Sequence, residues 1–115
     1  AQAKAIQRCE HLPQVRFQIL NVPADYPNER FDLVVVSEVG YYWSREDLAK
    51  AQTKIIDSLQ PKGQLLLVHW LPDVPDYPLT GDDVHNAFMA QCPQRLCHLL
   101  GYRAEQYRLD LFERA

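Results

Sequence analysis

The chain has 115 residues, which is enough for one domain or part of one, and its formal net charge is −3. Its 12 lysines and arginines are scattered rather than gathered into a basic stripe, which argues against nucleic acid as a partner. The longest largely apolar stretch, 65–71, is far shorter than the ~20 residues of a membrane span. Residues 1–11 lack the apolar run of a secretory signal peptide. The 3 cysteines are an odd number without the spacing of a disulfide framework, so we expect reduced thiols in a cytoplasmic protein.

The first thirty residues predict a helix, a short strand and a loop. Residues 1–11 are rich in alanine and predict the end of a helix that stops before Pro13. Residues 15–20 (VRFQIL) alternate apolar and polar side chains, which predicts a strand with one better-covered face. Residues 21–30 hold two prolines with Asn and Asp, a composition typical of a loop.

The middle of the chain predicts a strand, a helix and a second strand. Residues 31–39 (FDLVVVSEV) and 64–70 (QLLLVHW) contain continuous apolar runs, typical of strands buried on both faces of a parallel sheet. Between them, Ser44-x-x-Asp47 resembles the capping box that opens a helix, and residues 60–63 (QPKG) predict the turn that ends it. A strand, helix and strand with short connections indicate a right-handed βαβ unit with parallel strands.

The last third predicts a loop, a helix and a closing strand. The proline-rich segment 71–80 is expected to be a loop, and residues 81–91 predict a helix. Pro93 either breaks this helix or begins a second one that runs through Leu100. Residues 102–113 alternate apolar and polar side chains and predict a final strand, antiparallel and at the edge of the sheet.

Several segments resemble the class I S-adenosylmethionine-dependent methyltransferases. The strand FDLVVVSEVGYYW, a helix and then LQPKGQLLLVHW are similar to the fourth and fifth strands of that family. SEVGYY, VHW and DYPLTGDDVH together resemble the nodulation protein S group, whose members methylate the free amine of a chito-oligosaccharide, and the likeness extends over nearly the whole chain. The resemblance implies a partial Rossmann-like α/β fold, with a mostly parallel sheet and an antiparallel C-terminal edge strand.

The resemblance also implies that a segment of the family's fold has no counterpart in this chain. The 4 glycines are isolated, and none forms the GxGxxG loop that would hold the methionine and ribose parts of the cofactor. We therefore expect residues 1–115 to form a single, truncated methyltransferase domain without the N-terminal glycine-rich strand–loop–helix. Residues 31–39 would then present an exposed apolar edge, through which we expect the chain to form a homodimer or swap segments.

Polar residues follow both predicted buried strands. Ser37 and Glu38 come after the first, and His69 and Trp70 after the second, at the carboxyl ends where open α/β sheets bind ligands. The resemblance implies methyl transfer from S-adenosylmethionine to an amino sugar, oligosaccharide or similar small amine, with S-adenosylhomocysteine as the product. A carboxylate or imidazole can orient an amine or take its proton, so Glu38 and His69 are the candidate catalytic residues. The alternatives are a solvated or capping Glu38 and a His69 that is a satisfied core residue.

Candidate acceptor-binding residues lie near these two positions. Tyr41, Tyr42 and Trp70 could line an acceptor pocket, because aromatic faces suit sugar rings and alkylammonium groups. Asp82 and His85 lie one helical turn apart and could bind acceptor hydroxyls or the amine at the rim. The alternatives are aromatic packing over the sheet, helix capping by Asp82 and a solvated His85.

Candidate cofactor-binding residues follow the predicted strands 15–20 and 31–39. The resemblance implies cofactor contacts from Asn21, Val22, Ser37, Glu38 and Val39. Asn21 stands where family members usually carry Asp, and its amide can still hydrogen-bond an exocyclic amine.

Other kinds of function are less well supported by the residues. Cys92-x4-Cys97-His98 has poor ligand spacing for zinc, so no metal site is expected. Ser37 lacks the GxSxG elbow of a hydrolase nucleophile. Two alternatives stay open. One is a catalytically silent half-domain that acts as an interaction module or as one piece of a split protein. The other is an O-methyltransferase.

Overall fold

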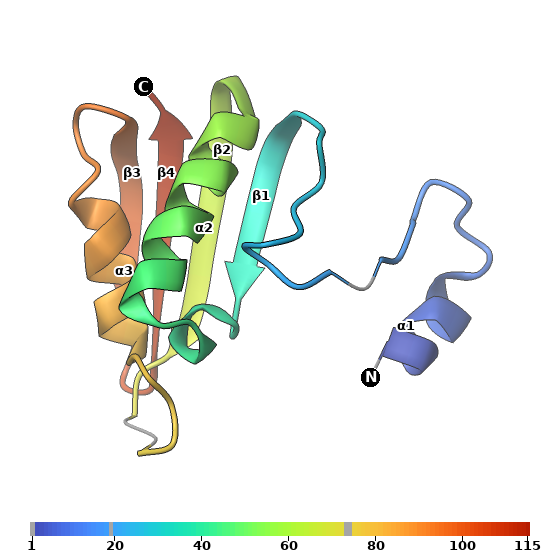
Figure 1. Ribbon diagram of the computed structural model, residues 1–115, viewed down its shortest axis with the longest axis horizontal. Helices are drawn as coiled ribbons and strands as arrows, with labels where there is room; N and C mark the ends of the chain where they lie inside the picture. The colour runs from blue at the N-terminus through green and yellow to red at the C-terminus, as the bar shows by residue number, and fades with distance from the viewer. Residues whose placement is uncertain (1, 19, 73–74) are drawn as a thin grey trace.

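The computed structural model describes residues 2–18, 20–72 and 75–115. The helices are α1 (Gln2–Cys9), α2 (Arg45–Ser58) and α3 (Gly81–Met89), with a 3-10 turn at Gly40–Tyr42, and the strands are β1 (Phe31–Ser37), β2 (Leu59–Trp70), β3 (Leu96–Arg103) and β4 (Tyr107–Arg114). The strands form one sheet in the order β1-β2-β4-β3. Figure 1 shows α2 and α3 over the same face of this sheet, with α1 apart from it.

The predicted βαβ unit is confirmed. β1 and β2 are parallel neighbours, with Val34 paired to Leu65 in the register, and α2 connects them. α2 begins where the capping pattern predicts, because the hydroxyl of Ser44 accepts the backbone N–H of Asp47 at 3.1 Å and satisfies a free donor of the first turn. The carboxyl ends of the two strands therefore lie side by side at one end of the sheet.

The core lies between the sheet and the two helices that cover it. Leu65 and Leu67 of β2, Phe112 of β4, and Val84 and Phe88 of α3 are all fully buried. Each side chain of this kind stabilises the fold by about 1.5–3 kcal/mol when it is removed from water. This core fixes α3 against β2 and β4 and thereby places the residues at the carboxyl end of β2.

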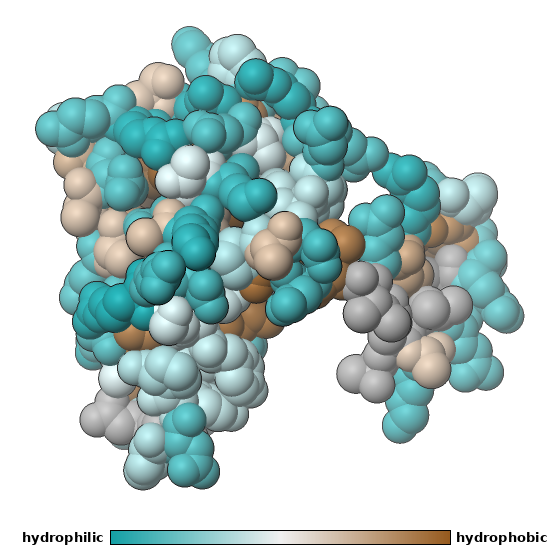
Figure 2. All heavy atoms as spheres, in the orientation of Figure 1, coloured by the Kyte–Doolittle hydropathy of each residue, from teal (hydrophilic) through white to brown (hydrophobic). Residues whose placement is uncertain are grey.

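The opposite face of the sheet is open. Leu33 and Val35 of β1 and Leu100 and Tyr102 of β3 each expose more than half of their surface, and Figure 1 shows no described helix over them. In Figure 2, which views the helix side, hydrophilic residues cover the outside of α2, while hydrophobic residues gather between the sheet and the N-terminal segment. β1 has a neighbour on one side only, so it is the exposed apolar edge that the sequence predicts.

The predicted strand at 15–20 is not formed. Residues 15–18 and 20 have no regular secondary structure, and Ile19 lies outside the described residues. A strand forms only where its backbone groups can pair with a neighbouring strand. In the described sheet β1 pairs only with β2, and the described residues of this segment form no strand along the free side of β1, so Val15 and Phe17 stay exposed.

The boundary between α2 and β2 also differs from the prediction. The helix ends at Ser58, and residues 60–63 belong to β2 rather than to a separate turn. The register between β1 and β2 shifts here, which marks a β-bulge or a similar irregularity. Lys62 has a φ of 62°, in the left-handed region that a bulge residue can occupy. The residues QPKG, which predicted a turn, thus lie in an irregular part of strand β2.

The C-terminal third forms a hairpin. No second helix follows Pro93, because residues 91–95 form a turn that leads into β3, whose Leu96 is buried and pairs with Arg114 of β4. The segment 102–113, predicted as one strand, contains the end of β3, a turn and most of β4. β4 is antiparallel to β2 as predicted, but it lies inside the sheet, and β3 forms the edge. Residues 73 and 74 of the predicted loop 71–80 lie outside the described residues.

Candidate functional site

Glu38 stands at the carboxyl end of β1 and bridges to β2. Its backbone has a φ of 60°, in the left-handed region that is uncommon for residues other than glycine. Its carboxylate accepts the backbone N–H of Trp70 at 2.7 Å and the hydroxyl of Tyr41 at 3.1 Å, and its own N–H donates to the carbonyl of Val68 at 3.0 Å. These contacts hold the carboxylate at one place above the ends of the two strands.

A small cavity of about 130 Å³ lies against this carboxylate. Its lining residues are Glu38, Tyr41, Trp70, Pro72, Tyr77, Leu79, Thr80 and Gly81. A Cβ atom at Gly81 would lie 2.5 Å from the carbonyl oxygen of Trp70, so only glycine lets α3 begin this close to the end of β2. We name this the Glu38 cavity; it combines one carboxylate with aromatic walls.

A cluster of tyrosines forms one side of the Glu38 cavity. The ring of Tyr41 stacks on that of Tyr77, with centroids 5.1 Å apart and an angle of 7°, and the hydroxyls of Tyr42 and Tyr77 lie 2.9 Å apart. Burial, followed by the hydrogen bond to Glu38, raises the pKa of Tyr41 to about 12. Tyr41 therefore remains a neutral donor that holds the carboxylate throughout the physiological range. Tyr77 lies in the predicted proline-rich loop, where no spacing pattern marks it as a site residue.

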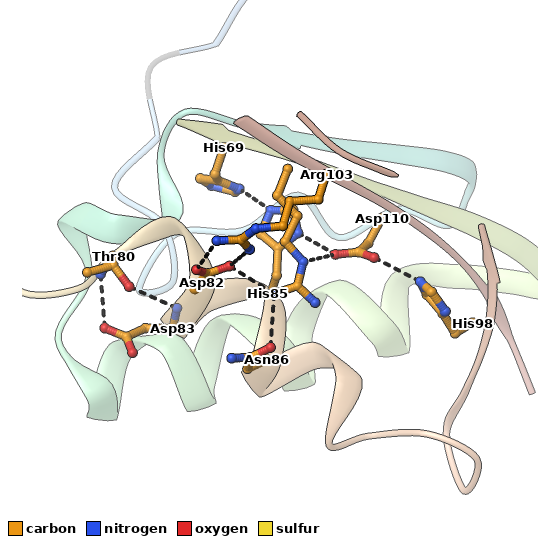
Figure 3. Close-up of polar contacts among 10 residues, drawn as sticks. His69, Thr80, Asp82, Asp83, His85, Asn86, His98, Arg103 and Asp110 are labelled. Carbon is orange, nitrogen blue, oxygen red and sulfur yellow. Dashed lines mark hydrogen bonds and ion pairs between the residues drawn. The ribbon is translucent and has the colours of Figure 1, made fainter. Parts of the chain in front are cut away.

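His69 is fully buried and faces away from the Glu38 cavity. Its Nε2 accepts the backbone N–H of Gly40 at 3.0 Å, and its Nδ1 lies 2.9 Å from Nε2 of His85, as Figure 3 shows. Burial, and then the neighbouring His85, lower the pKa of His69 to about 4. Both ring nitrogens are occupied by protein partners, so this arrangement leaves no nitrogen free for an acceptor.

His85 and Asp82 are not brought to the Glu38 cavity either. His85 is fully buried, and its Nδ1 lies 2.6 Å from Oδ2 of Asp110, while burial lowers its pKa. Asp82 accepts from Arg103 at 2.6 and 3.0 Å and from Arg108 at 3.1 Å, and the contact with Arg103 lowers its pKa. The helix cap that the sequence analysis considered for Asp82 belongs instead to Thr80, whose capping-box partner is Asp83.

A second cavity, of about 400 Å³, lies beside the exposed edge of β1. Asn21, Val22 and Val39 line it, together with Tyr42 and Trp43. The indole N–H of Trp43 donates to the carbonyl of Val22 at 3.1 Å and ties the irregular N-terminal segment to the turn after β1. We name this the β1-edge cavity. It unites three of the five predicted cofactor-binding residues.

Ser37 and Glu38, the other two, are not among the residues that line the β1-edge cavity. Ser37 ends β1, and Glu38 lines the smaller cavity on the other side of the turn. Among the described residues no group of three or more side chains could hold a metal ion, and no helix is long and apolar enough to cross a membrane.

No family model and no curated protein matches the sequence, whereas solved structures do match the fold. A candidate methyltransferase from Pseudomonas syringae is 29% identical, with a TM-score of 0.81 over 97% of this chain and 65% of its own. The N-methyltransferase NodS from Bradyrhizobium japonicum, in complex with S-adenosylhomocysteine, is 19% identical, with a TM-score of 0.80 over 99% of this chain and 61% of its own. An O-methyltransferase family protein from Burkholderia thailandensis is 12% identical, with a TM-score of 0.76 over 99% of this chain and 40% of its own.

The chain thus spans 65% and 61% of the first two structures that it matches. Nearly all of it superposes on them, including the mixed sheet and the helices on its covered face. The fold of this chain is therefore the partial Rossmann-like α/β fold that the sequence predicts, as found in S-adenosylmethionine-dependent methyltransferases.

Proposed function

We propose that this chain is part of an S-adenosylmethionine-dependent methyltransferase that methylates the amine of an amino sugar, an oligosaccharide or a similar small polar acceptor. The observation that carries the proposal is the Glu38 cavity, where a fixed carboxylate faces aromatic rings at the carboxyl ends of two parallel strands. The methyltransferase fold of the neighbours supports the reaction class, and the N-methyltransferase among them agrees with an amine acceptor.

The β1-edge cavity fits the adenine end of the cofactor. Its wall is largely apolar, and Asn21 supplies an amide that can pair with an exocyclic amine. Asn21, Val22 and Val39 would hold that part of the cofactor. Once bound, S-adenosylmethionine supplies an electrophilic methyl group. The described residues contain no glycine-rich loop to cradle the methionine part, so this chain contributes only a portion of the cofactor site.

Glu38 is the residue that handles the acceptor's proton. An ammonium group seated in the Glu38 cavity would donate to the carboxylate, which keeps accepting capacity beyond its contacts with Trp70 and Tyr41. Transfer of one proton to Glu38 leaves the amine with the lone pair that a displacement requires. Tyr41 and Trp70 line the cavity beside the carboxylate and offer ring faces to the cationic form of the amine.

Methyl transfer tests the proposal directly. The chain is incubated with S-adenosylmethionine labelled with ¹³C on the transferred methyl, and with glucosamine as the probe acceptor. We expect an N-methyl carbon signal that the Glu38→Gln variant reduces and the exposed Glu46→Gln variant does not. An O-methyl signal instead would favour the O-methyltransferase alternative, with which the Burkholderia neighbour agrees. No methyl product from a chain that still binds S-adenosylhomocysteine would mean that turnover needs the glycine-rich loop that this chain lacks, whereas neither product nor binding would favour the silent interaction module.

The open edge of β1 supports a further part of the proposal, a homodimer. Leu33 and Val35 are exposed on a strand with one free side, which is a template for strand pairing with a second copy. Light scattering should give twice the chain mass of 13.4 kDa. Val35→Lys, which places a charge on this edge strand, should return the monomer, and a monomeric wild-type chain would contradict the dimer.

A cytoplasmic location goes with this proposal. Cys92 and Cys97 are both free thiols, as expected for a reducing compartment.

A further inference from the structure

A series of hydrogen-bonded polar side chains, three of them buried, runs from the outer edge of the sheet to the turn that carries Glu38. Its members, in order, are His98, Asp110, His85 and His69, and the last one reaches the backbone of Gly40. Figure 3 shows the three side chains from β2, α3 and β4 pointing toward one another beneath the sheet. His69 and His85 are fully inaccessible and Asp110 nearly so. Neither the Glu38 cavity nor the β1-edge cavity is lined by any of them.

The contacts permit only one arrangement of protons. The backbone N–H of Gly40 can only donate, so Nε2 of His69 must be an unprotonated acceptor. The single proton of His69 then sits on Nδ1 and is donated to Nε2 of His85, 2.9 Å away. That acceptor must be bare, so the proton of His85 sits on its Nδ1 and is donated to the carboxylate of Asp110 at 2.6 Å. Both rings are therefore neutral, and both carry the proton on Nδ1.

The charged groups around the pair are consistent with two neutral rings. Asp110 also forms an ion pair with Arg108 at 2.9 Å and contacts His98 at 2.8 Å, so its negative charge has cationic or donating partners apart from His85. Arg108 also pairs with Asp82 on α3. The other neighbour of His69 is the Tyr41 ring, which meets it edge-on with centroids 5.4 Å apart and carries no charge.

His69, at the inner end of this hydrogen-bonded series, fixes the turn that builds the Glu38 cavity. Gly40 begins the 3-10 turn two residues after Glu38, and Tyr41 follows it directly. A Cβ atom at Gly40 would lie 2.6 Å from Val84 and 3.0 Å from Nε2 of His69, so the backbone rests directly on the imidazole. The carbonyl of Tyr41 in turn accepts the N–H of Leu79, another cavity residue. A shift of the Gly40 amide would move two walls of the cavity.

We propose that His69, His85 and Asp110 are positioning residues for the acceptor site: Asp110 fixes the proton on each histidine, and His69 thereby holds the Gly40 amide and, with it, the Glu38–Tyr41 turn. The statement that the cavity takes an acceptor rests on the proposed function, while the proton arrangement and its hold on Gly40 do not. His69 acts through the turn and does not touch the acceptor. The buried pair thus couples α3 and β4 to the geometry of the cavity.

Ring nitrogens observed by ¹⁵N NMR of the folded chain test the proton arrangement without any variant. We expect His69 and His85 both to be neutral with the proton on Nδ1, the less common form of a free imidazole. A proton on Nε2 of either ring, or a doubly protonated ring at neutral pH, would overturn the proposal.

Variants at His85 test the positioning role. His85→Phe removes the acceptor of the His69 proton, so we expect the amide resonances of Gly40 and Trp70 to move and the dissociation constant for glucosamine to rise roughly tenfold, the size of one lost hydrogen bond. His85→Gln offers a carbonyl oxygen to His69 and should restore both values toward the wild type. His11→Phe, the same change at an exposed histidine, should alter neither.

Two results separate this inference from the proposed function. A folded His85→Phe variant with unchanged Gly40 and Trp70 amides overturns the positioning role, even if methyl transfer is observed. If the wild-type chain transfers no methyl group but shows both Nδ1 protons and the expected amide changes, the proposed function fails and the hold of the histidine pair on the turn stands. If His85→Phe does not fold, the ring nitrogens and His85→Gln decide: unaltered amides in His85→Gln support the role, and displaced ones contradict it.

Discussion

Acidification should destabilise this chain, because the folded state holds neutral histidines in its interior. The pKa of His69 falls from an ordinary 6.5 to about 4 in the folded chain, chiefly through burial. Between these two pH values, His69 therefore binds a proton in the unfolded chain but not in the folded chain. The stability contributed by neutral His69 is complete above pH 6.5 and is lost progressively as the pH falls toward 4. His85, whose pKa is also lowered by burial, adds a loss of the same sign.

The size of this effect follows from the His69 values. Linkage between pKa values of 6.5 and about 4 gives a loss of roughly 2–3 kcal/mol in the free energy of unfolding between pH 7.5 and 4.5. This is a large share of the roughly 5–15 kcal/mol by which domains are stable. Urea unfolding, followed by the fluorescence of Trp43 and Trp70 at a series of pH values, measures it.

A matched pair of variants assigns the loss to the buried ring. His85→Gln should make the pH dependence shallower, since it removes one of the two buried rings, whereas His11→Phe at an exposed position should leave it unchanged. The reasoning would be refuted if the free energy of unfolding stayed constant or rose as the pH falls from 6.5 to 4.5. That result would mean that protonation of the buried rings does not destabilise the folded chain.

Three substitutions test other parts of the account. Ser44→Ala removes the hydroxyl that caps α2 and should cost about 1 kcal/mol in urea unfolding, with Ser37→Ala at the exposed end of β1 as the control; an unchanged stability would contradict the cap. Gly40→Ala drives a methyl group to within 2.6 Å of Val84 and should cost about 1–3 kcal/mol, and no loss would mean that the turn does not rest on His69 and Val84. Glu38→Gln should leave the fold intact and reduce methyl transfer about 100-fold in an active preparation, whereas equal rates would remove Glu38 from the reaction.

Patterns within short stretches of sequence correctly predicted the strand–helix–strand unit in the middle of the chain. The apolar run of β1, the capping box at Ser44 and the apolar run of β2 lie close together in the chain, and the βαβ unit follows from their order and spacing. The carboxyl end of this unit is also where the sequence placed Glu38, Tyr41 and Trp70, and these residues do share one cavity.

The remaining differences depend on distant parts of the chain. Residues 15–20 alternate like a strand, but alternation does not specify which strand a segment pairs with, and the described part of this segment is irregular. β3 could not be recognised after Pro93, because its residues are strand only through pairing with β4.

The contacts of the buried histidines could not be predicted from the sequence for the same reason. His69, His85 and Asp110 come from three elements, and their separations of 16 positions between the two histidines and 25 between His85 and Asp110 carry no periodic signal. His69 was expected beside Glu38, because both residues follow buried strands. The strand pleat instead turns His69 toward the helices, while Trp70 exposes 42% of its surface beside Glu38.

Cofactor binding is the decisive property, because we propose that this chain contributes to a site for S-adenosylmethionine and an acceptor. S-adenosylhomocysteine is titrated into the ¹⁵N-labelled chain while the backbone amides are observed by NMR. We expect the resonances of Asn21, Val22 and Val39 to shift and saturate together, with those of the distant hairpin β3–β4 unchanged. Amides of the β1-edge cavity that do not move in a folded chain would contradict the assignment of this cavity to the cofactor.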